Sequence, residues 1–374
     1  MIKILHIASF EGNIGDNASH LGFLNILSRV TDDTQITRLE IRKAYRNYKS
    51  PDKLTFDETF ANLANQFDCI IFGGGGFLDY WVEGSSNGTT IDIENKIFDL
   101  ITKPILITSI GSNPHRKVPK ENYEKFKSFL NYVKQKENIT IALRNDGSID
   151  SIEKDFGEEF LTIFDQVLDH GFFYEPSNES EGLKINADYA VINITNDQLE
   201  MFNEGRKVTN KDWYHVELKK IVTFLIDSMK LKVVFVPHIY SDVHAISDFI
   251  KVLPDAYMRS KIIVAPCYQG DSATDFIFNI YKNSKLVIAS RYHSNVCSMK
   301  FGKQTIGLSP LKRIDYIHKQ FFSSKTSFFI DENFGDSVIN SISGDSLPNA
   351  KKLENMKNLT LEFYRGYFNR LRIN

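Results

Sequence analysis

The sequence predicts an α/β protein of two doubly wound, Rossmann-like domains with parallel sheets that face a cleft. Short apolar runs alternate with amphipathic stretches of helical length almost from end to end of the 374 residues. A polar, turn-rich stretch between about Gly171 and Asn186 interrupts this alternation. Because strands separated by helices form parallel sheets with right-handed crossovers, the interruption divides the chain into two such sheets.

The first half contains five predicted strands and the helices between them. The segment NYEKFKSFLNYVKQ, for example, places Tyr123, Phe126 and Leu130 on one face at helical spacing. Each strand candidate is a short apolar run of the kind that is buried in a parallel sheet. In chain order these runs are IKILHIA, TQITRLEI, CIIFGGG, PILITSIG and ITIALR.

The second half repeats the pattern with YAVINIT, LKVVFVPH, KIIVAP, KLVIAS and QTIGLS. We place the first domain at residues 1–178 and the second at 179–345. Residues 346–374 are predicted to form a helix that packs back on the first domain. Two parallel-sheet domains that face a cleft form a GT-B-like architecture.

Composition narrows the function class. A formal net charge of −2 argues against a dedicated nucleic-acid binder, since no basic excess would neutralise phosphates. Cys69, Cys267 and Cys297 are widely spaced, which fits reduced thiols better than a disulfide framework or a zinc site. The N-terminus is predicted to be a strand with no cleavage site, and no apolar run reaches spanning length. We therefore expect a cytoplasmic protein.

Two glycine-containing turns follow predicted strands. EGNIGDNA, with Asn13, Gly15 and Asp16, exposes backbone N–H groups that can cradle an anion, although it is neither a dinucleotide fingerprint nor a Walker loop. A tight turn with Asp16 as the helix N-cap explains it equally well. The run Gly73–Gly76 indicates backbone that bends sharply or comes close to something, which is either a ligand, at Gly74 and Gly75, or a helix packed on this loop at the cleft floor.

Charged residues stand at predicted strand ends in both halves. In KLVIASRYHSN, Ser290, Arg291 and His293 come just past a buried strand, and Arg144 has the same place in the first half. Open α/β sheets bind ligands at this edge, and arginine suits carboxylate or phosphate. The alternatives are a surface turn for the Arg-x-His segment and a structural salt bridge for Arg144.

Two further strand ends carry basic residues. His238 follows VVFVP, where a histidine is often only a capping group, and Lys312 with Arg313 follows the strand after the Arg-x-His segment. A neighbouring parallel strand would bring one of these two cations beside His293. No metal site is expected, because there is no H-E-x-x-H and no cluster of carboxylates at ligand spacing.

The motifs of the chain, taken in order, resemble those of the polysaccharide pyruvyltransferase family. They are G-N-x-G-D, the glycine cluster, R-x-D, P-H-x-x-x-D, and R-x-H with a later lysine. The resemblance runs from Gly12 to Lys312. The chain departs from the family at Tyr292, where leucine is common. Residues 170–215 show no familiar motif, which leaves their role open.

The resemblance implies transfer of the enolpyruvyl group of phosphoenolpyruvate to a sugar diol, which forms a cyclic pyruvate ketal without a cofactor or metal. Arg144, Arg291 and Lys312 would bind the anionic donor, His293 would protonate its methylene carbon, and Asp16 would orient or deprotonate an acceptor hydroxyl. The first domain would be the acceptor side and the second the donor side. Further substrate contacts are expected from Asn13, Gly15, Gly74, Gly75, His238 and Ser290.

Two other functions fit the same architecture. A metal-independent GT-B glycosyltransferase would use a nucleotide sugar, although no E-x(7)-E-type donor signature stands in the second half. An anion-binding regulatory module is disfavoured by the full set of charged strand ends. The residues do not identify the acceptor sugar or its carrier, and the resemblance suggests that this carrier is often a lipid. They also leave open the position and stereochemistry of the ketal and the oligomeric state. The resemblance places the reaction in cell-surface or exopolysaccharide synthesis.

The C-terminal segment has two interpretations. If residues 361–372 are helical, Phe363, Tyr367, Phe368 and Leu371 fall broadly on one side. That side either packs on the first domain or makes a weak, salt-sensitive contact with the inner face of a membrane, where the family's lipid-linked acceptors are built.

Overall fold

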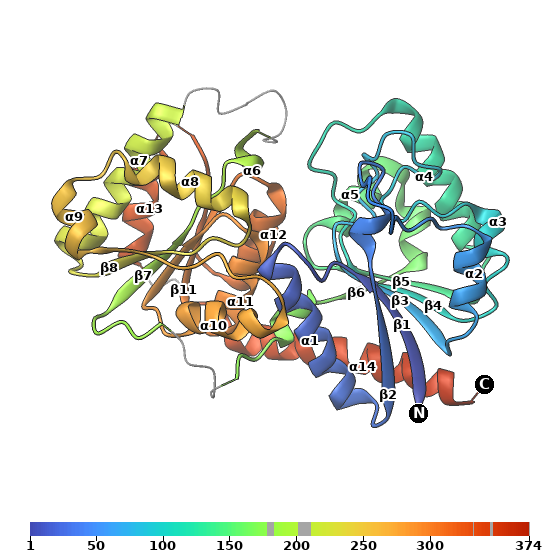
Figure 1. The fold of residues 1–374 in the computed structure, drawn as a ribbon. Coiled ribbons are helices and arrows are strands. Elements are labelled where there is room, and N and C mark those ends of the chain that lie inside the picture. The colour runs from blue at the N-terminus through green and yellow to red at the C-terminus, as the bar shows by residue number, and fades with distance from the viewer. Residues whose placement is uncertain (178–182, 201–210, 332, 345–346, 374) are drawn as a thin grey trace. The chain divides into compact units, whose positions relative to one another are not determined.

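The computed structural model describes residues 1–177, 183–200, 211–331, 333–344 and 347–373. The chain forms two compact units (Figure 1). Unit 1 comprises Met1–Phe10, Gly22–His170 and Met356–Asn374, and unit 2 comprises Glu11–Leu21 and Gly171–Asn355. The division thus falls between His170 and Gly171 rather than between residues 178 and 179. It also assigns an N-terminal segment to unit 2, which the sequence pattern did not indicate.

Unit 1 is built on a six-stranded parallel sheet in the order β2-β1-β3-β4-β5-β6. The five strands predicted in this half are present, and β6 is an additional strand at the sheet edge. The strands are β1 (Ile2–Ala8), β2 (Thr34–Glu40), β3 (Cys69–Gly75), β4 (Ile105–Ile110), β5 (Ile139–Arg144) and β6 (Phe164–Val167). The helical elements are α1 (Ile14–Val30, which begins in unit 2), η1 (Ile41–Ala44), α2 (Glu58–Ala64), α3 (Asn95–Phe98), α4 (Lys120–Val133), α5 (Ser148–Phe156), η2 (Glu158–Ile163), η3 (His170–Phe173, of which only His170 belongs to unit 1) and α14 (Ala350–Ile373, which belongs to unit 1 from Met356 on).

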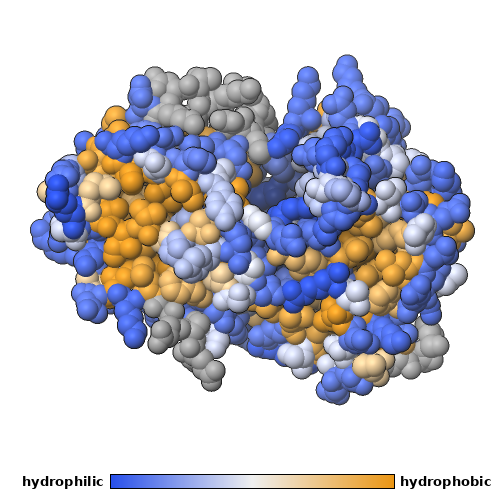
Figure 2. All heavy atoms as spheres, viewed as in Figure 1, coloured by the Kyte–Doolittle hydropathy of each residue, from blue (hydrophilic) through white to orange (hydrophobic). Residues whose placement is uncertain are grey.

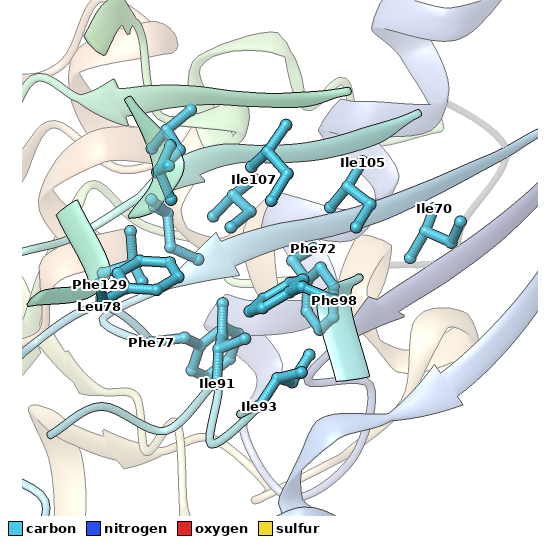
Figure 3. Packing of buried hydrophobic residues seen from close by; sticks show 14 of the residues in the cluster. Ile70, Phe72, Phe77, Leu78, Ile91, Ile93, Phe98, Ile105, Ile107 and Phe129 are labelled. Carbon is cyan, nitrogen blue, oxygen red and sulfur yellow. The ribbon is translucent and has the colours of Figure 1, made fainter. Parts of the chain in front are cut away.

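One face of this sheet packs on an apolar core. Ile70 and Phe72 of β3 and Ile105 and Ile107 of β4 contribute to it together with Phe98 of α3 (Figure 3). Side chains alternate between the faces of a strand, so the neighbouring residues point to the opposite face. The two-sided burial explains why these strands are almost continuously apolar.

The C-terminal helix α14 packs in unit 1 through aromatic side chains. Tyr364 is fully buried, and its hydroxyl lies 2.6 Å from both Thr108 Oγ1 and His170 Nε2. Tyr367 and Phe368 are also buried. Tyr364, Tyr367 and Phe368 of the predicted C-terminal helix therefore pack within unit 1, whereas Phe363 and Leu371 are half-buried.

Unit 2 is built on a second six-stranded parallel sheet in the order β12-β11-β10-β7-β8-β9. The five predicted strands are again present, with β12 added at the edge. The strands are β7 (Tyr189–Asn193), β8 (Lys232–Phe235), β9 (Ile262–Val264), β10 (Leu286–Ala289), β11 (Gln304–Ser309) and β12 (Ser327–Phe329). The helical elements are α6 (Asp197–Glu200), α7 (Lys211–Thr223), the π-helix η4 (Phe224–Ser228), α8 (Tyr240–Ile250), α9 (Asp255–Ser260), α10 (Asp271–Lys282), α11 (Tyr292–Lys300), α12 (Lys312–Phe321) and α13 (Phe334–Ile342).

Helices cover both faces of the second sheet (Figure 1). Ile192 of β7 and Ile288 of β10 pack with α7 and α13 on one face. Val191 and Val287, which alternate with them, pack with α10 and the first turns of α1 on the other face. This is the doubly wound α/β arrangement that the alternation of strands and helices predicts.

Buried histidine hydrogen bonds connect α12 to its neighbours in unit 2. His318 Nδ1 lies 2.8 Å from Thr326 Oγ1, and its Nε2 lies 2.8 Å from Asn295 Oδ1 of α11. Burial lowers the pKa of His318 to about 3, and the nearby Asp315 carboxylate offsets only part of this effect. The side chain is therefore neutral at physiological pH.

The surface mixes residue types. The face shown in Figure 2 carries hydrophobic and hydrophilic residues beside one another, and the exposed large hydrophobic residues of unit 2 include Tyr240, Val252 and Val264. Within the described ranges, no helix is both long enough and apolar enough to cross a membrane.

The two tyrosines of α14 allow a matched test of its polar contacts. Tyr364→Phe removes a hydroxyl with two partners and should lower the free energy of unfolding by about 1–3 kcal/mol. Tyr367→Phe removes a buried hydroxyl for which no partner is found among the described residues, and should cost little or stabilise. Urea unfolding of both variants measures the difference. Equal losses would show that the Tyr364 contacts add no stability.

His318 should make unit 2 sensitive to acid. The unfolded side chain binds a proton below pH 6.5, whereas the folded one stays neutral down to about pH 3, so stability falls as the pH drops through this interval. At about pH 5 the loss from this residue should be about 2 kcal/mol relative to about pH 7.5. Urea unfolding at both values should show a correspondingly smaller pH dependence in His318→Gln. His244→Gln, at an exposed position of α8, serves as the control, and an unchanged pH dependence in His318→Gln would contradict the assignment.

Candidate functional site

The order of strands in unit 2 reverses between β7 and β10. At this point Asn193 makes hydrogen bonds to residues that follow β10 and β8. Its backbone carbonyl accepts a hydrogen bond from Ser290 N at 3.0 Å, and its Oδ1 accepts one from Arg291 N at 2.9 Å. Its Nδ2 donates to the carbonyl of Val236, just past β8, at 2.9 Å. In open α/β sheets, ligands bind outside the carboxyl ends of the strands where the order reverses. Arg291 and His293 follow β10 at this position.

Arg291 is held between two carboxylates. Its guanidinium lies 2.5 Å from Asp242 Oδ1 and 2.8 Å from Asp197 Oδ1, and only 8 % of the residue is exposed. Burial opposes its charge, but the two carboxylates outweigh burial and raise the pKa of Arg291. Asp242 is fully buried, whereas about a third of the Asp197 side chain is exposed. The surroundings of Arg291 are therefore more open on the Asp197 side than on the Asp242 side.

His293 lies in the first turn of α11 and packs against the beginning of α1. Its Nδ1 is 3.7 Å from Asp16 Oδ1. A Cβ atom on Gly15 would lie 2.8 Å from the His293 Cβ, so only glycine lets this backbone approach the imidazole so closely. Asn13 accepts the Gly15 N–H through Oδ1 at 3.0 Å. Asn13, rather than Asp16, therefore caps α1, which leaves the Asp16 carboxylate beside His293.

His238 is buried and is hydrogen-bonded to Ser294, the residue after His293. Its Nε2 lies 2.9 Å from Tyr281 OH and 3.0 Å from Ser294 Oγ, which is the neighbour of His293. Burial, together with the charges of Arg291 and His293, lowers the pKa of His238 well below its ordinary value. His238 is 1 % exposed. It therefore acts as a neutral hydrogen-bonding residue that positions α11, as the capping interpretation predicts.

Lys312 and Ser290 border the same strand ends. Lys312 is exposed at the first position of α12, directly after β11, the parallel neighbour of β10. Ser290 is completely buried, and its hydroxyl has no hydrogen-bond partner within the described part of the chain. The strand that precedes Lys312 therefore pairs with the strand that precedes Arg291 and His293, as the sequence predicts.

The glycine run of unit 1 lies against neighbouring side chains. Gly74 and Gly75 have positive φ values of 70° and 136°. A Cβ on Gly75 would lie 2.7 Å from the Phe77 ring, and one on Gly73 would lie 3.3 Å from His6 Nε2. The close approach that the sequence indicated therefore involves neighbouring side chains, while ligand contact at Gly74 and Gly75 remains a prediction.

Arg144 forms a buried salt bridge in unit 1. Its Nε donates to Asp146 Oδ2 at 2.7 Å, its Nη1 lies 3.4 Å from Asp169 Oδ2, and the residue is 2 % exposed. A Cβ on Gly111 would lie 2.9 Å from Arg144 Nη2, so the loop after β4 closes over the guanidinium. This is the structural alternative of the sequence analysis, and it leaves the arginine little surface for a donor.

Each unit gathers some of the predicted residues. Unit 1 contains Gly74, Gly75 and Arg144, and unit 2 brings together Asn13, Gly15, Asp16, His238, Ser290, Arg291 and His293, with Lys312 at the adjacent strand end. Among the described residues, no group of three or more His, Cys, Asp or Glu side chains is arranged to hold a metal ion.

Sequence reasoning missed several residues at these strand ends. Asn193 lies within YAVINIT and Asp197 follows it, and both contact Arg291, but neither belonged to a recognisable motif. In unit 1, His115 Nδ1 lies 3.1 Å from Asp79 Oδ2. Asp79 comes three residues after the end of the glycine run and His115 after a predicted strand, so their positions at two neighbouring strand ends were the available signal.

The fold is similar to that of solved structures that include an epimerase and a glycosyltransferase. UDP-GlcNAc 2-epimerase from Methanocaldococcus jannaschii is 10 % identical, with a TM-score of 0.57 over 96 % of this chain and 99 % of that one. A glycosyltransferase from Rickettsia africae is 11 % identical, with a TM-score of 0.55 over 100 % and 99 %. Anabaena Alr3699/HepE, solved with UDP-glucose, is 9 % identical, with a TM-score of 0.54 over 98 % and 100 %. At these identities the likeness establishes the GT-B-like fold alone.

Sequence comparison gives the family. No curated protein matches this chain. The polysaccharide pyruvyl transferase family matches residues 13–311, a range that includes Asn13 at the cap of α1, the Arg144 salt bridge and the Arg291–His293 segment. The chain therefore belongs to the polysaccharide pyruvyl transferase family.

Proposed function

We propose that this protein transfers the enolpyruvyl group of phosphoenolpyruvate to two hydroxyls of a sugar and so forms a cyclic pyruvate ketal. The observation that carries the proposal is the pair of His293 and Asp16, held beside Arg291 where the strand order of unit 2 reverses. A donor with up to three negative charges needs cations, and an imidazole held next to it can deliver a proton.

The donor is assigned to Arg291 and Lys312. Both follow strands that pair with each other, and Lys312 is exposed at the first position of α12. The N–H groups at the beginning of α11 add a favourable dipole for an anion. Arg144 is assigned the role of fixing the strand ends of unit 1, because its burial leaves it little surface for substrate.

His293 is the acid of the proposed reaction. It gives its proton to the methylene carbon of the donor, and the first sugar hydroxyl adds to the neighbouring carbon as its own proton passes to solvent, from which His293 regains a proton. Phosphate then leaves, and the second hydroxyl closes the ring as its proton passes to the departing phosphate. One molecule each of phosphoenolpyruvate and diol thus gives one ketal and one hydrogen phosphate. Asp16 orients the imidazole through Nδ1.

Product analysis tests the proposal directly. The purified protein is incubated with phosphoenolpyruvate and a panel of sugar acceptors, and phosphate release is followed together with mass spectrometry of the acceptor. Nucleotide sugars are supplied in parallel, and UDP release is measured. Phosphate release with a ketal product supports the proposal, whereas UDP release without it would favour a glycosyltransferase.

His293→Gln should abolish most turnover without loss of the fold. General acid catalysis contributes about 10²–10⁴-fold, so the turnover number should fall by this factor while phosphoenolpyruvate still binds. His244→Gln, at the exposed position on α8, is the control and should keep full activity. Steady-state kinetics and calorimetric titration of the donor give the two readouts. Turnover near that of the unmodified protein would remove His293 from the mechanism.

Lys312→Ala should weaken donor binding. Removing a charge-assisted contact costs about 1.5–3 kcal/mol, which is a loss of affinity of roughly 10- to 150-fold. Lys319→Ala on the same helix is the control, since Lys319 is 74 % exposed and pairs with Asp315. Calorimetric titration with phosphoenolpyruvate compares the two variants. Equal affinities would place the donor away from the start of α12.

A further inference from the structure

Unit 1 contains a second pair of a histidine and an aspartate that the acid step does not use. His115 stands on the loop after β4 and Asp79 on the loop after β3, and these strands are parallel neighbours. His115 Nδ1 lies 3.1 Å from Asp79 Oδ2. Because the carboxyl ends of parallel strands lie at one edge of a sheet, the pair occupies the edge at which α/β sheets bind ligands.

The aspartate of this pair is fixed and the histidine is accessible. The Asp79 side chain is 1 % exposed, and its Oδ1 accepts the backbone N–H of Asn113 at 2.8 Å. The His115 side chain is 20 % exposed. A buried carboxylate on Nδ1 fixes the tautomer in which Nε2, on the other side of the ring, exchanges protons.

An aromatic ring and a cation complete the cluster. The indole of Trp81 meets the His115 ring edge to face, with 5.7 Å between centroids, and the guanidinium of Arg116 lies 4.5 Å from the centre of the Trp81 ring. Asn113 links this cluster to the Arg144 salt bridge, since its Nδ2 donates to the carbonyl of Asp146 at 3.0 Å. The cluster therefore stands on a rigid part of the edge.

The chemistry of a ketal transfer gives this pair a task. The first hydroxyl of the acceptor has to lose its proton, whereas Asp16 lies beside His293 Nδ1 and is assigned to that histidine. We propose that Asp79, His115, Trp81 and Arg116 form an acceptor subsite for a sugar, in which His115 Nε2 takes the proton of a hydroxyl. The electron pair of that O–H bond forms the new C–O bond, and the proton passes from Nε2 to solvent. This inference rests on the proposed function.

Sugar binding at Trp81 is measurable without the donor. The chain has two tryptophans, so Trp213→Phe leaves Trp81 as the only one, and its fluorescence reports on this edge. The probes are the methyl glycosides of galactose, glucose, mannose and N-acetylglucosamine. At least one should change the emission with saturation, and Arg116→Ala should weaken that response.

Kinetics separate a base from a structural salt bridge. His115→Gln and Asp79→Asn should each lower the turnover number by about 10²–10⁴-fold, while the affinity for phosphoenolpyruvate is retained. Exogenous imidazole should partly restore His115→Ala, which a merely structural defect would not allow. His244→Ala is the control and should match the unmodified protein with and without imidazole.

The outcomes distinguish the inference from the proposed function. Ketal formation by the unmodified protein together with full activity in His115→Gln overturns the inference and leaves the function standing. If no acceptor yields phosphate from phosphoenolpyruvate, the function fails, and saturable Trp81 fluorescence alone supports the sugar subsite. Absence of that fluorescence change with all four glycosides overturns the subsite in either case.

Discussion

A buried guanidinium has to be neutralised where it lies, and each unit satisfies this constraint at the carboxyl edge of its sheet. Arg291 is held by Asp242 and Asp197, and Arg144 by Asp146 with Asp169. Removing one carboxylate would leave a charge in a medium that solvates it poorly, which costs several kcal/mol. The segments that supply the carboxylates are therefore fixed with the arginines. His293 follows Arg291 by two residues, and the loop that carries His115 is hydrogen-bonded to Asp146 through Asn113.

The histidines fall into two groups according to what faces their ring nitrogens. His238 and His318 are buried against hydroxyl or amide groups, and their pKa values are lowered so that they stay neutral. His293 and His115 instead have a carboxylate beside Nδ1. The first group is suited to holding helices in place, and the second to exchanging protons. Residue type alone does not separate them, because the distinction depends on the partner that the fold supplies.

Much of the fold could be predicted from the sequence because the central strands are apolar on both faces. The edge strands β6 and β12 escaped prediction, since one side of an edge strand is open and the apolar run is short or broken. The charged strand ends were also predictable, because they interrupt apolar runs abruptly. The partners of these charged residues could not be predicted. Arg144 contacts Asp169 and His293 lies near Asp16, and the local sequence pattern contains no information about such distant partners. The same limit applies to Asp79 and His115.

The division of the chain has a consequence for its synthesis on the ribosome. Residues 11–21 belong to unit 2, whose other residues begin at Gly171, and α14 completes unit 1 from the far end of the chain. The segment with Gly15 and Asp16 thus emerges long before the His293 side chain that it packs against, and Thr108 and His170 emerge long before Tyr364. Domains usually fold one after another as the nascent chain lengthens. Here neither unit has its full set of contacts until translation is nearly complete, so both acquire their final packing at almost the same time.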